Sequence, residues 1–344
     1  MSAKARREAP RRKVDVRGEG CWLATFGALT AVEFGWWAYC WELGIAPVPH
    51  VATYLALAAT GLAGAFVLRL AFTRRAERAE WPVLLVGAML IGLGASLFLP
   101  LKYTIPRLVP FWLDAPLALG ERRLFGTDPW LIADRLFGWA LIPIDRLYGL
   151  WLPVQSLVLF SVVLLPASRV KSRALVAYGI AWFLLGIVAA DLCASVGPIF
   201  YDRLLGGSEF AGLDVKSRGG AWMARGEADA MWASFVSGRP SLVAGISAMP
   251  SLHVAISFWM WLAARALAPR FALIALAYAI LMWIASVQLG WHYLSDGLAG
   301  MAGMAAIWWL AGRIALAAGS RSPSHIDVRF PRPRTLLAAD AVEN

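Results

Sequence analysis

The sequence has little charge, few histidines and few cysteines. Only 16% of its 344 residues are charged, whereas 60% are hydrophobic and the mean hydropathy is +0.62. A soluble globular domain carries roughly 25% charged residues, so the composition excludes that class. The three cysteines, Cys21, Cys40 and Cys193, show no redox or metal-binding spacing, and we assign them no function.

Long apolar runs make up most of the chain. About eight windows of mainly apolar residues are each long enough to cross a hydrocarbon core of about 30 Å. They lie near 21–45, 51–73, 81–101, 150–167, 174–199, 247–267, 270–290 and 292–318. Because only helices or a closed barrel satisfy backbone hydrogen bonds in lipid, we expect an all-α, polytopic membrane bundle of about eight transmembrane helices.

The net charge is +10, but the positions of the basic residues do not indicate nucleic-acid binding. They cluster at alternate ends of the predicted spans, in AKARREAPRRKVDVR, TRRAERAE, SRVKSR, ARALAPR and GSRSPSHIDVRFPRPR. These segments all lie on one side of the membrane if the helices alternate in direction. The positive-inside rule makes that side cytoplasmic, so we expect both termini in the cytoplasm.

Two long connections, about 102–149 and about 200–246, then lie on the non-cytoplasmic side. Both contain many tryptophans and prolines. This composition is typical of segments that lie at the bilayer interface and form short amphipathic helices. We therefore expect interfacial loops here rather than disordered linkers.

Two of the four histidines belong to patterns that suggest chemistry. His253 lies in AMPSLHVA at the start of the sixth predicted span, and His292 lies in LGWHYLSDGLAG at the start of the eighth. The topology inferred from charge places both span starts on the non-cytoplasmic side. His50 and His325 belong to no such pattern, and we interpret them as packed or solvated residues.

The spacing of His292 and Asp296 suggests a functional pair. They are four residues apart, which places them on one face of a helix. A carboxylate there fixes the tautomer of the imidazole and leaves its other nitrogen free as a base or nucleophile. Ionisable groups at membrane depth are costly to place and are functional candidates. A metal site built from His253, His292 and Asp296 is the rival interpretation, but the sequence offers no further obvious ligand.

Pro250 and Ser251, just before His253, predict an anion site. Proline is well tolerated in the first turn of a helix. The free backbone N–H groups of that turn and the positive end of the helix dipole attract anions. We therefore expect a helix start that holds an anion beside an imidazole.

The segments PSLH at 250–253 and HYLSD at 292–296 resemble the second and third signature motifs of the type 2 phosphatidic acid phosphatase (PAP2) superfamily. The leucine variant MPSLH is similar to the branch that contains inositol phosphorylceramide synthase and related inositolphosphotransferases. The resemblance covers 81–318 and implies a PAP2-like six-helix catalytic core. Residues 21–80 then form two additional transmembrane helices, and 1–20 and 319–344 are cytoplasmic tails.

The resemblance also implies a role for each motif residue. His292 matches the nucleophile that forms a phosphohistidine, and Asp296 matches the carboxylate that orients it. His253 matches the acid that protonates the leaving oxygen, and Ser251 matches a position that contacts phosphate. Such enzymes use no metal and no organic cofactor.

The chain departs from the family pattern where phosphate-binding cations are expected. Ser286 stands at the position of the third-motif arginine, and the first motif is not matched. The best cationic candidates are Lys102 and Arg107, which follow the third predicted span, and Arg239, which precedes the sixth. Transfer of a phosphoryl group requires positive charge, so we expect at least one of them to bind phosphate.

A further stretch, SVGPIFYDR at 195–203, is similar to a segment common in the synthase-like branch. It follows the fifth predicted span on the non-cytoplasmic side. On this resemblance we place Tyr201 near the substrate phosphate.

The leading hypothesis is a membrane lipid phosphotransferase. It would move a phosphorylated headgroup, such as phosphoinositol, from a phospholipid donor to the hydroxyl of ceramide, diacylglycerol or another lipid acceptor. The alternative is a phosphatase that acts on phosphatidate or a polyprenyl phosphate, with water as acceptor. A non-catalytic lipid-binding or transport protein is the third possibility. The motif leucine and the absent arginine favour the transferase, with an outward-facing site in the inner membrane if the host is a bacterium.

Overall fold

The computed structural model describes residues 17–73, 81–213, 219–239 and 245–320. The basic tails before residue 17 and after residue 320, and the basic turn at 74–80, lie outside these residues. The described part is helical and contains no strand. The helices are α1 (Arg17–Glu42), α2 (Val51–Thr73), α3 (Trp81–Leu108), α4 (Asp114–Phe125), α5 (Pro129–Phe137), α6 (Leu141–Gly149), α7 (Trp151–Val163), α8 (Arg169–Phe183), α9 (Ala189–Leu192), α10 (Pro198–Leu205), α12 (Trp222–Ser237), α13 (Leu252–Leu267), α14 (Ala272–Gln288) and α15 (Leu294–Ser320).

Several of these helices are long and apolar enough to cross a membrane, which confirms the predicted helical membrane bundle. Among the described residues five segments meet this criterion: Val51–Ala71, Trp81–Leu108, Arg169–Leu192, Pro269–Gln288 and Leu294–Ala318. A sixth span results if Pro129–Gly149 and Trp151–Val163, which are bent by 47°, are counted together.

The remaining two predicted spans correspond to α1 and α13. The middle of α1 carries Glu33, Trp36 and Trp37, which lower its hydropathy. Helix α13 has only 16 residues because it begins at Leu252 rather than near residue 247. Length and composition therefore support five or six spans in the described residues, with helices at all of the predicted positions.

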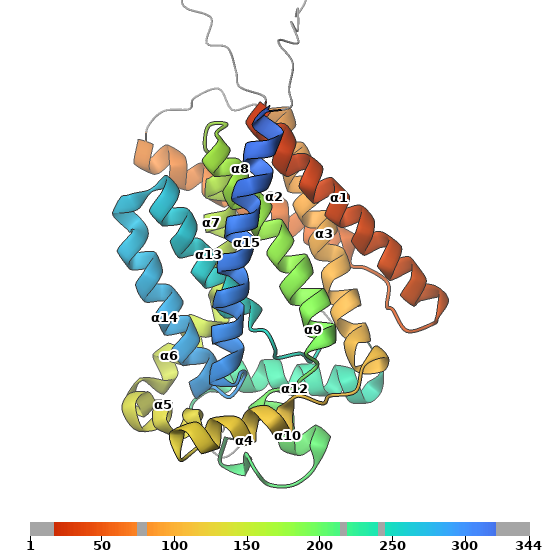
Figure 1. The fold of residues 1–344 in the computed structure, drawn as a ribbon, viewed down its shortest axis with the longest axis vertical. Coiled ribbons are helices and arrows are strands. Elements are labelled where there is room, and N and C mark those ends of the chain that lie inside the picture. The colour runs from red at the N-terminus through yellow and green to blue at the C-terminus, as the bar shows by residue number, and fades with distance from the viewer. Residues whose placement is uncertain (1–16, 74–80, 214–218, 240–244, 321–344) are drawn as a thin grey trace, which may run out of the picture.

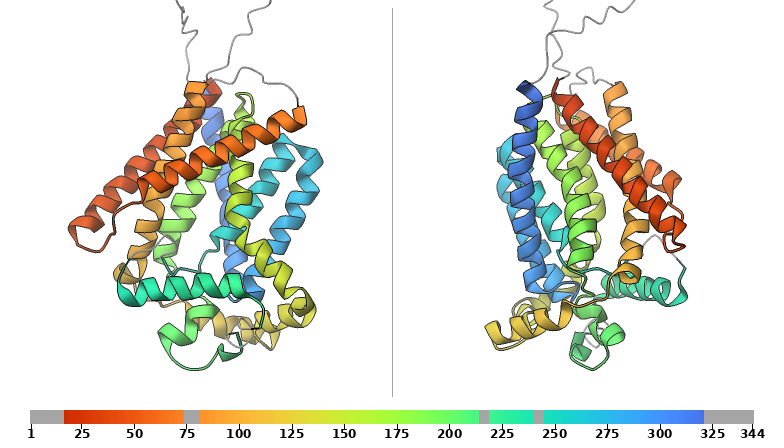
Figure 2. Two further views of the ribbon diagram at one scale, coloured as in Figure 1. Left: turned by 180° about the vertical axis from the view of Figure 1, so that it is seen from behind. Right: turned by 45° about the vertical axis from the view of Figure 1, so that its right-hand side comes forward.

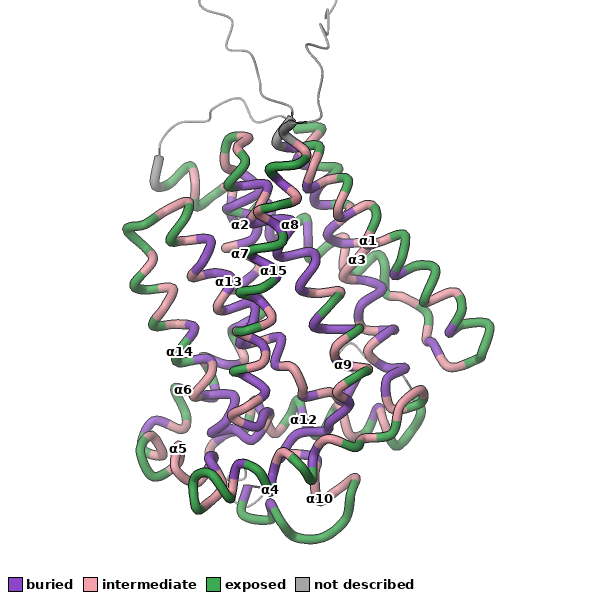
Figure 3. The backbone as a smooth tube through the Cα atoms, viewed as in Figure 1, coloured by how far each residue is buried: buried purple, intermediate pink, exposed green. Residues whose placement is uncertain are grey.

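Most of the long helices run side by side, α1 and α2 are inclined to the others, and the short helices gather at one end of the bundle (Figures 1 and 2). The start of α1, the end of α15 and the α7–α8 and α13–α14 connections lie together at the opposite end. The two predicted interfacial loops fold into α4, α5 and α6 and into α10 and α12, and α12 lies across the end of the bundle. The buried residues lie mainly between the long helices and at the contacts between the short helices and the long ones (Figure 3).

Two helices end at different positions from those expected. Helix α3 continues through Pro100 and Pro106 to Leu108, so Lys102 and Arg107 lie in a helix and not in the following loop. The fifth predicted span ends at Leu192, after a π-helical segment at Leu184–Val188. The motif segment at 195–203 therefore starts as a buried turn and continues as the separate helix α10.

Helices α1 and α2 pack on the rest of the bundle. Both contact α3, while α1 also contacts α8 and α2 contacts α7. An ion pair joins Lys171 of α8 to Glu19 of α1 at 2.5 Å, with both side chains at most 5% exposed. The indole of Trp22 donates a second hydrogen bond to Glu19. A buried pair of this kind is costly to break on one side only, so it holds α1 against the core.

Candidate active site

The structure brings His253 and His292 together. Their ring centroids are 6.2 Å apart, although the residues belong to different helical segments. His253 lies in the first turn of α13, and His292 lies just before α15. Both helices begin toward the end of the bundle that carries the short helices (Figure 1). The convergence expected from the charge pattern is thus present in the fold.

His292 and Asp296 face each other, but not on one helix as the spacing suggested. His292 lies in a turn and only Asp296 belongs to α15. The distance from His292 Nδ1 to Asp296 Oδ2 is 3.4 Å, and Asp296 is fully buried. The same oxygen accepts a hydrogen bond from the Tyr293 N–H at 3.0 Å. The backbone N–H of His292 donates to the Ser286 carbonyl at 3.2 Å, which ties the turn to α14.

Ser251 joins the two motifs. It caps α13 through its Oγ, which accepts from the Val254 N–H at 3.4 Å, and its own N–H donates to the Asp296 carbonyl at 3.0 Å. Pro250 therefore precedes the cap and does not lie in the first turn, contrary to the expectation. A Cβ at Gly300 would lie 2.5 Å from the Ser251 carbonyl oxygen, so glycine allows α15 to approach this closely.

Aromatic rings surround the imidazole of His253. The ring of Tyr148 stacks on it at 4.8 Å with an interplanar angle of 22°. The ring of Trp151 lies 4.2 Å away on α7, and Trp291 lies 6.3 Å from Tyr148 in a parallel arrangement. Sequence reasoning missed these residues, because aromatic residues at the border of an interfacial loop are common in membrane proteins and carry no local signal of a site.

Of the three cationic candidates, Lys102 is the one whose charge reaches His253. Its side chain packs against Gly245. No carboxylate of the described residues forms an ion pair with Lys102. Arg107 is exposed and folds back onto Tyr103, whose hydroxyl accepts a hydrogen bond from it at 2.8 Å. Arg239 is exposed after the end of α12, and no contact with the histidines is found for it in the described residues.

Tyr201 and Ser286 lie near the site without reaching the histidine pair through a described contact. Tyr201 of α10 packs against Phe210 at 5.1 Å, and Phe210 in turn packs against Tyr293 at 6.2 Å. Ser286, at the position of the absent arginine, is fully buried. Its hydroxyl donates to the Trp283 carbonyl at 2.8 Å.

Asp114, which sequence reasoning also missed, connects the third motif to the turn before α10. Its carboxylate accepts hydrogen bonds from the N–H groups of Val196 at 2.9 Å and Gly197 at 3.0 Å. It also accepts one from the Tyr293 hydroxyl at 3.1 Å. Burial raises the pKa of Asp114, and the hydrogen bonds from these three groups oppose the rise. The carboxylate thereby holds the residue next to His292 in place.

Two more carboxylates of the first interfacial segment hold the ends of other helices. Glu121 accepts from the N–H of Ser295 at 2.7 Å and from its hydroxyl at 2.6 Å, at the start of α15. Asp145 accepts from the N–H groups of Met223 at 3.0 Å and Ala224 at 2.8 Å, at the start of α12. Acidic side chains at helix N-termini are stabilising, because they satisfy free N–H groups and complement the helix dipole.

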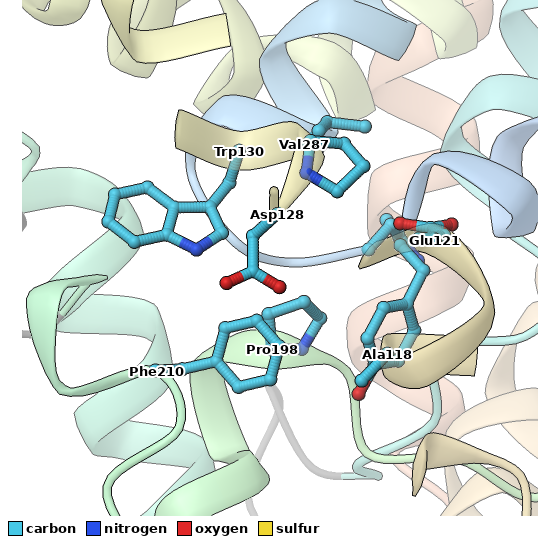
Figure 4. Close-up of a pocket in the computed structure, with 10 residues that line it drawn as sticks. Ala118, Glu121, Asp128, Trp130, Pro198, Phe210 and Val287 are labelled. Carbon is cyan, nitrogen blue, oxygen red and sulfur yellow. The ribbon is translucent and has the colours of Figure 1, made fainter. Parts of the chain in front are cut away.

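A small pocket opens beside His292 (Figure 4). It is lined by Ala118, Glu121, Asp128, Pro129, Trp130, Pro198, Phe210, Val287, His292 and Tyr293. The Asp128 carboxylate points into the space between Trp130, Phe210 and Pro198. Arg122 does not offer a free cation here, because it is paired with Asp128 at 2.6 Å and with Glu209.

Comparison with models of known protein families gives a match. A family model described as the PAP2 superfamily matches residues 117–310, which is more than half of the 344-residue chain. The matched region runs from α4 into α15 and includes both histidine motifs. The comparisons with curated proteins and with solved structures found no match. Within the described residues, no cluster of three or more His, Cys, Asp or Glu side chains is arranged to hold a metal ion.

Proposed function

The chain belongs to the PAP2 superfamily, and from this premise we propose that it is a membrane lipid phosphotransferase that works through a phosphohistidine. Membership supports an integral membrane protein of lipid phosphatase or phosphotransferase type. The observation that carries the finer proposal is the pair of imidazoles with ring centroids 6.2 Å apart. The charge of Lys102 reaches His253, and no ion pair to Lys102 is found among the described residues. A phosphoryl group between the two rings has a nucleophile on one side, an acid on the other and a positive charge close by.

The proposed reaction has two displacement steps, which replace one difficult step by two easier ones. In the first, His292 attacks phosphorus, the N–P bond forms and the P–O bond to the donor glycerol breaks. His253 gives its proton to the leaving oxygen. In the second, the acceptor hydroxyl attacks phosphorus, its proton passes to His253 and the P–N bond breaks. Asp296 holds the His292 tautomer in both steps.

The Lys102 cation is expected to stabilise the charge on the phosphoryl oxygens. Lys102→Met should lower kcat/KM by about 10²-fold, as is typical when one electrostatic contact to a transition state is removed. Lys102→Arg should retain more activity, because it keeps the charge. The measurement is turnover of labelled phospholipid by purified protein in liposomes.

Arg107→Met is the matched control, because Arg107 is an exposed cation one to two turns along the same helix. It should leave kcat/KM nearly unchanged. Equal losses in the Lys102 and Arg107 variants would show that neither side chain acts specifically on the phosphoryl group, and the assignment of Lys102 would be wrong. Phosphate contact by Arg239, Tyr201 and Ser251 remains a proposal that these two variants do not test.

The choice of a lipid hydroxyl over water as acceptor is supported by the apolar walls around His253. Tyr148 and Trp151 pack against this imidazole and limit the access of water to it. The Leu252 side chain is buried in the core and packs closely against Gly186, where an added Cβ would lie 3.2 Å from it. Leu252 therefore supports the transferase only through the family resemblance. Phosphoinositol transfer to ceramide or diacylglycerol rests on the same resemblance.

An assay with two labelled donors tests the acceptor. Purified protein is given phosphatidylinositol or phosphatidate in liposomes, with and without ceramide or diacylglycerol. We expect a labelled lipid product that depends on the acceptor. Free phosphate released from phosphatidate without an acceptor would instead establish the phosphatase, and the absence of any product would support a non-catalytic lipid-binding protein.

We propose in addition that the site faces the non-cytoplasmic side, with both termini in the cytoplasm. The support is the shared position of the start of α1, the end of α15 and two connections that carry basic residues, at the end of the bundle away from the site (Figures 1 and 2). In a bacterium this orientation places the site on the outer face of the inner membrane.

A further inference from the structure

A second hollow, which we call the α5–α14 cleft, lies beside the His292 pocket and is lined by apolar side chains. Its volume is about 240 Å³, larger than the roughly 150 Å³ apolar cavity that holds a benzene molecule. It is lined by Phe125, Pro129, Ile132, Ala133, Leu136, Phe137, Trp283, Ile284, Val287 and Leu294. The indole N–H of Trp283 donates to the Leu294 carbonyl at 3.1 Å, so even this residue has its polar atom satisfied within the protein.

The α5–α14 cleft adjoins the pocket beside His292. Pro129 and Val287 line both spaces. The pocket is also lined by the polar groups of His292, Glu121 and Asp128, whereas every residue that lines the α5–α14 cleft has an apolar side chain or, in Trp283, a polar atom that is already hydrogen-bonded. The pocket itself has a volume of only about 10 Å³, room for about one water, so the phosphorylated end of a lipid is placed between His253 and His292 and not in the pocket. The apolar cleft between α5 and α14 then offers a place for the hydrocarbon tail of the same lipid.

The position of the cleft along the bundle agrees with this ligand. Trp283, Ile284 and Val287 belong to the last turns of the span Pro269–Gln288, at the end nearest His292. A lipid chain that lies along α14 in the hydrocarbon layer would therefore reach the phosphate-transfer site at its polar end. The volume of the cleft is suited to part of one chain, and it is too small for a helix about 10 Å across.

We propose that the α5–α14 cleft binds one hydrocarbon chain of the lipid substrate while the phosphorylated end of that lipid lies at His292. This inference rests on the proposed function, since it assigns a subsite for the substrate of that reaction. A lipid tail is in hydrocarbon both before and after binding, so the cleft acts through packing and positioning rather than through removal of apolar surface from water. It should therefore distinguish substrates by chain length.

Filling the cleft tests the proposal. Ile284→Phe and Ala133→Phe add volume from its two opposite walls, and Ile274→Phe is the matched control on the exposed part of α14. The probes are dioleoyl and dihexanoyl forms of whichever donor, phosphatidylinositol or phosphatidate, the unmodified protein turns over. Both cleft variants should lower kcat/KM for the dioleoyl lipid at least 10-fold and change it less than 3-fold for the dihexanoyl lipid. Equal losses on both lipids, or no loss on either, would overturn the proposal.

A second measurement does not depend on turnover. A phosphatidylinositol with a photoreactive diazirine near the end of one acyl chain is cross-linked to the unmodified protein in liposomes, and the modified peptides are mapped by mass spectrometry. We expect cross-links to be enriched at the cleft relative to Leu273, Ile274 and Ile280, which are exposed elsewhere on α14. The enrichment should be lost in Ile284→Phe and kept in Ile274→Phe.

The two measurements separate the failure of the cleft from the failure of the proposed function. If neither donor is turned over but the cross-links gather at the cleft, the transferase is wrong and the lipid subsite stands. If a donor is turned over but the cross-links are spread evenly over the lipid-facing side of α14, the subsite is wrong. Size-exclusion chromatography shows whether the cleft variants fold. If they do not, the cross-linking of the unmodified protein decides whether the cleft binds a lipid chain.

Discussion

Replacement of His292 by alanine is expected to abolish lipid turnover while the protein remains folded and inserted in the membrane. His292 is 6% exposed, and Asp296 lies 3.4 Å from its Nδ1, so its other nitrogen is free for the proposed attack on phosphorus. Loss of a nucleophile that forms a covalent intermediate removes the reaction path itself. We expect kcat to fall by about 10⁴-fold or more.

The measurement is acceptor-dependent turnover in liposomes, with His50→Ala as the control because His50 is an exposed histidine. A second readout is acid-labile, lipid-derived label on the protein when the acceptor is omitted. The unmodified protein and the His50 variant should carry this label, and the His292 variant should not. Retention of full activity by the folded His292 variant would show that the nucleophile is another group.

Replacement of Asp114 by alanine is expected to produce the largest loss of stability among changes near the site. The side chain is 1% exposed and accepts hydrogen bonds from Val196, Gly197 and Tyr293. Each buried donor left without an acceptor costs about 1–3 kcal/mol, so the free energy of unfolding should fall by roughly 3 kcal/mol or more. Turnover should also fall, because Tyr293 is adjacent to His292 and loses its acceptor.

Denaturant unfolding in detergent, followed by tryptophan fluorescence, measures this loss. Asp229→Ala is the matched control, because Asp229 is 47% exposed and pairs with the partly exposed Arg203 and Arg225. Exposed pairs of this kind contribute about 0–1 kcal/mol. Asp114→Asn, which keeps one acceptor oxygen, should be intermediate. If the Asp114 and Asp229 variants unfold at the same denaturant concentration, the carboxylate does not hold the site together.

The helical membrane bundle and the meeting of the two histidine motifs were predictable from the sequence. Long apolar runs predict helices because lipid offers no other partner to the backbone. The alternation of basic segments places the starts of the sixth and eighth spans at one end, and His253 and His292 meet there. The apolar character of α1 was overestimated. The helix is long enough to cross a membrane, but Glu33 and two tryptophans interrupt its apolar sequence.

Details that depend on local geometry were predicted less well. His292 lies in a turn and not on the helix of Asp296, although the four-residue spacing still brings the two side chains together. Lys102 and Arg107 appeared equivalent in the sequence. The continuation of α3 beyond Pro100 separates them. The charge of Lys102 reaches His253, whereas Arg107 folds onto Tyr103 at the surface.

The sequence by itself determined that the chain is a helical membrane protein and which two motifs are the candidates for its chemistry, because hydropathy and motif spacing are local properties. Only the tertiary structure decided which groups support those motifs. Asp114 meets Tyr293 across 179 residues, and Glu121 meets Ser295 across 174. In the sequence these carboxylates resemble ordinary solvated residues of a loop. They become buried acceptors only when the loop folds over the helix ends and leaves their donors without water.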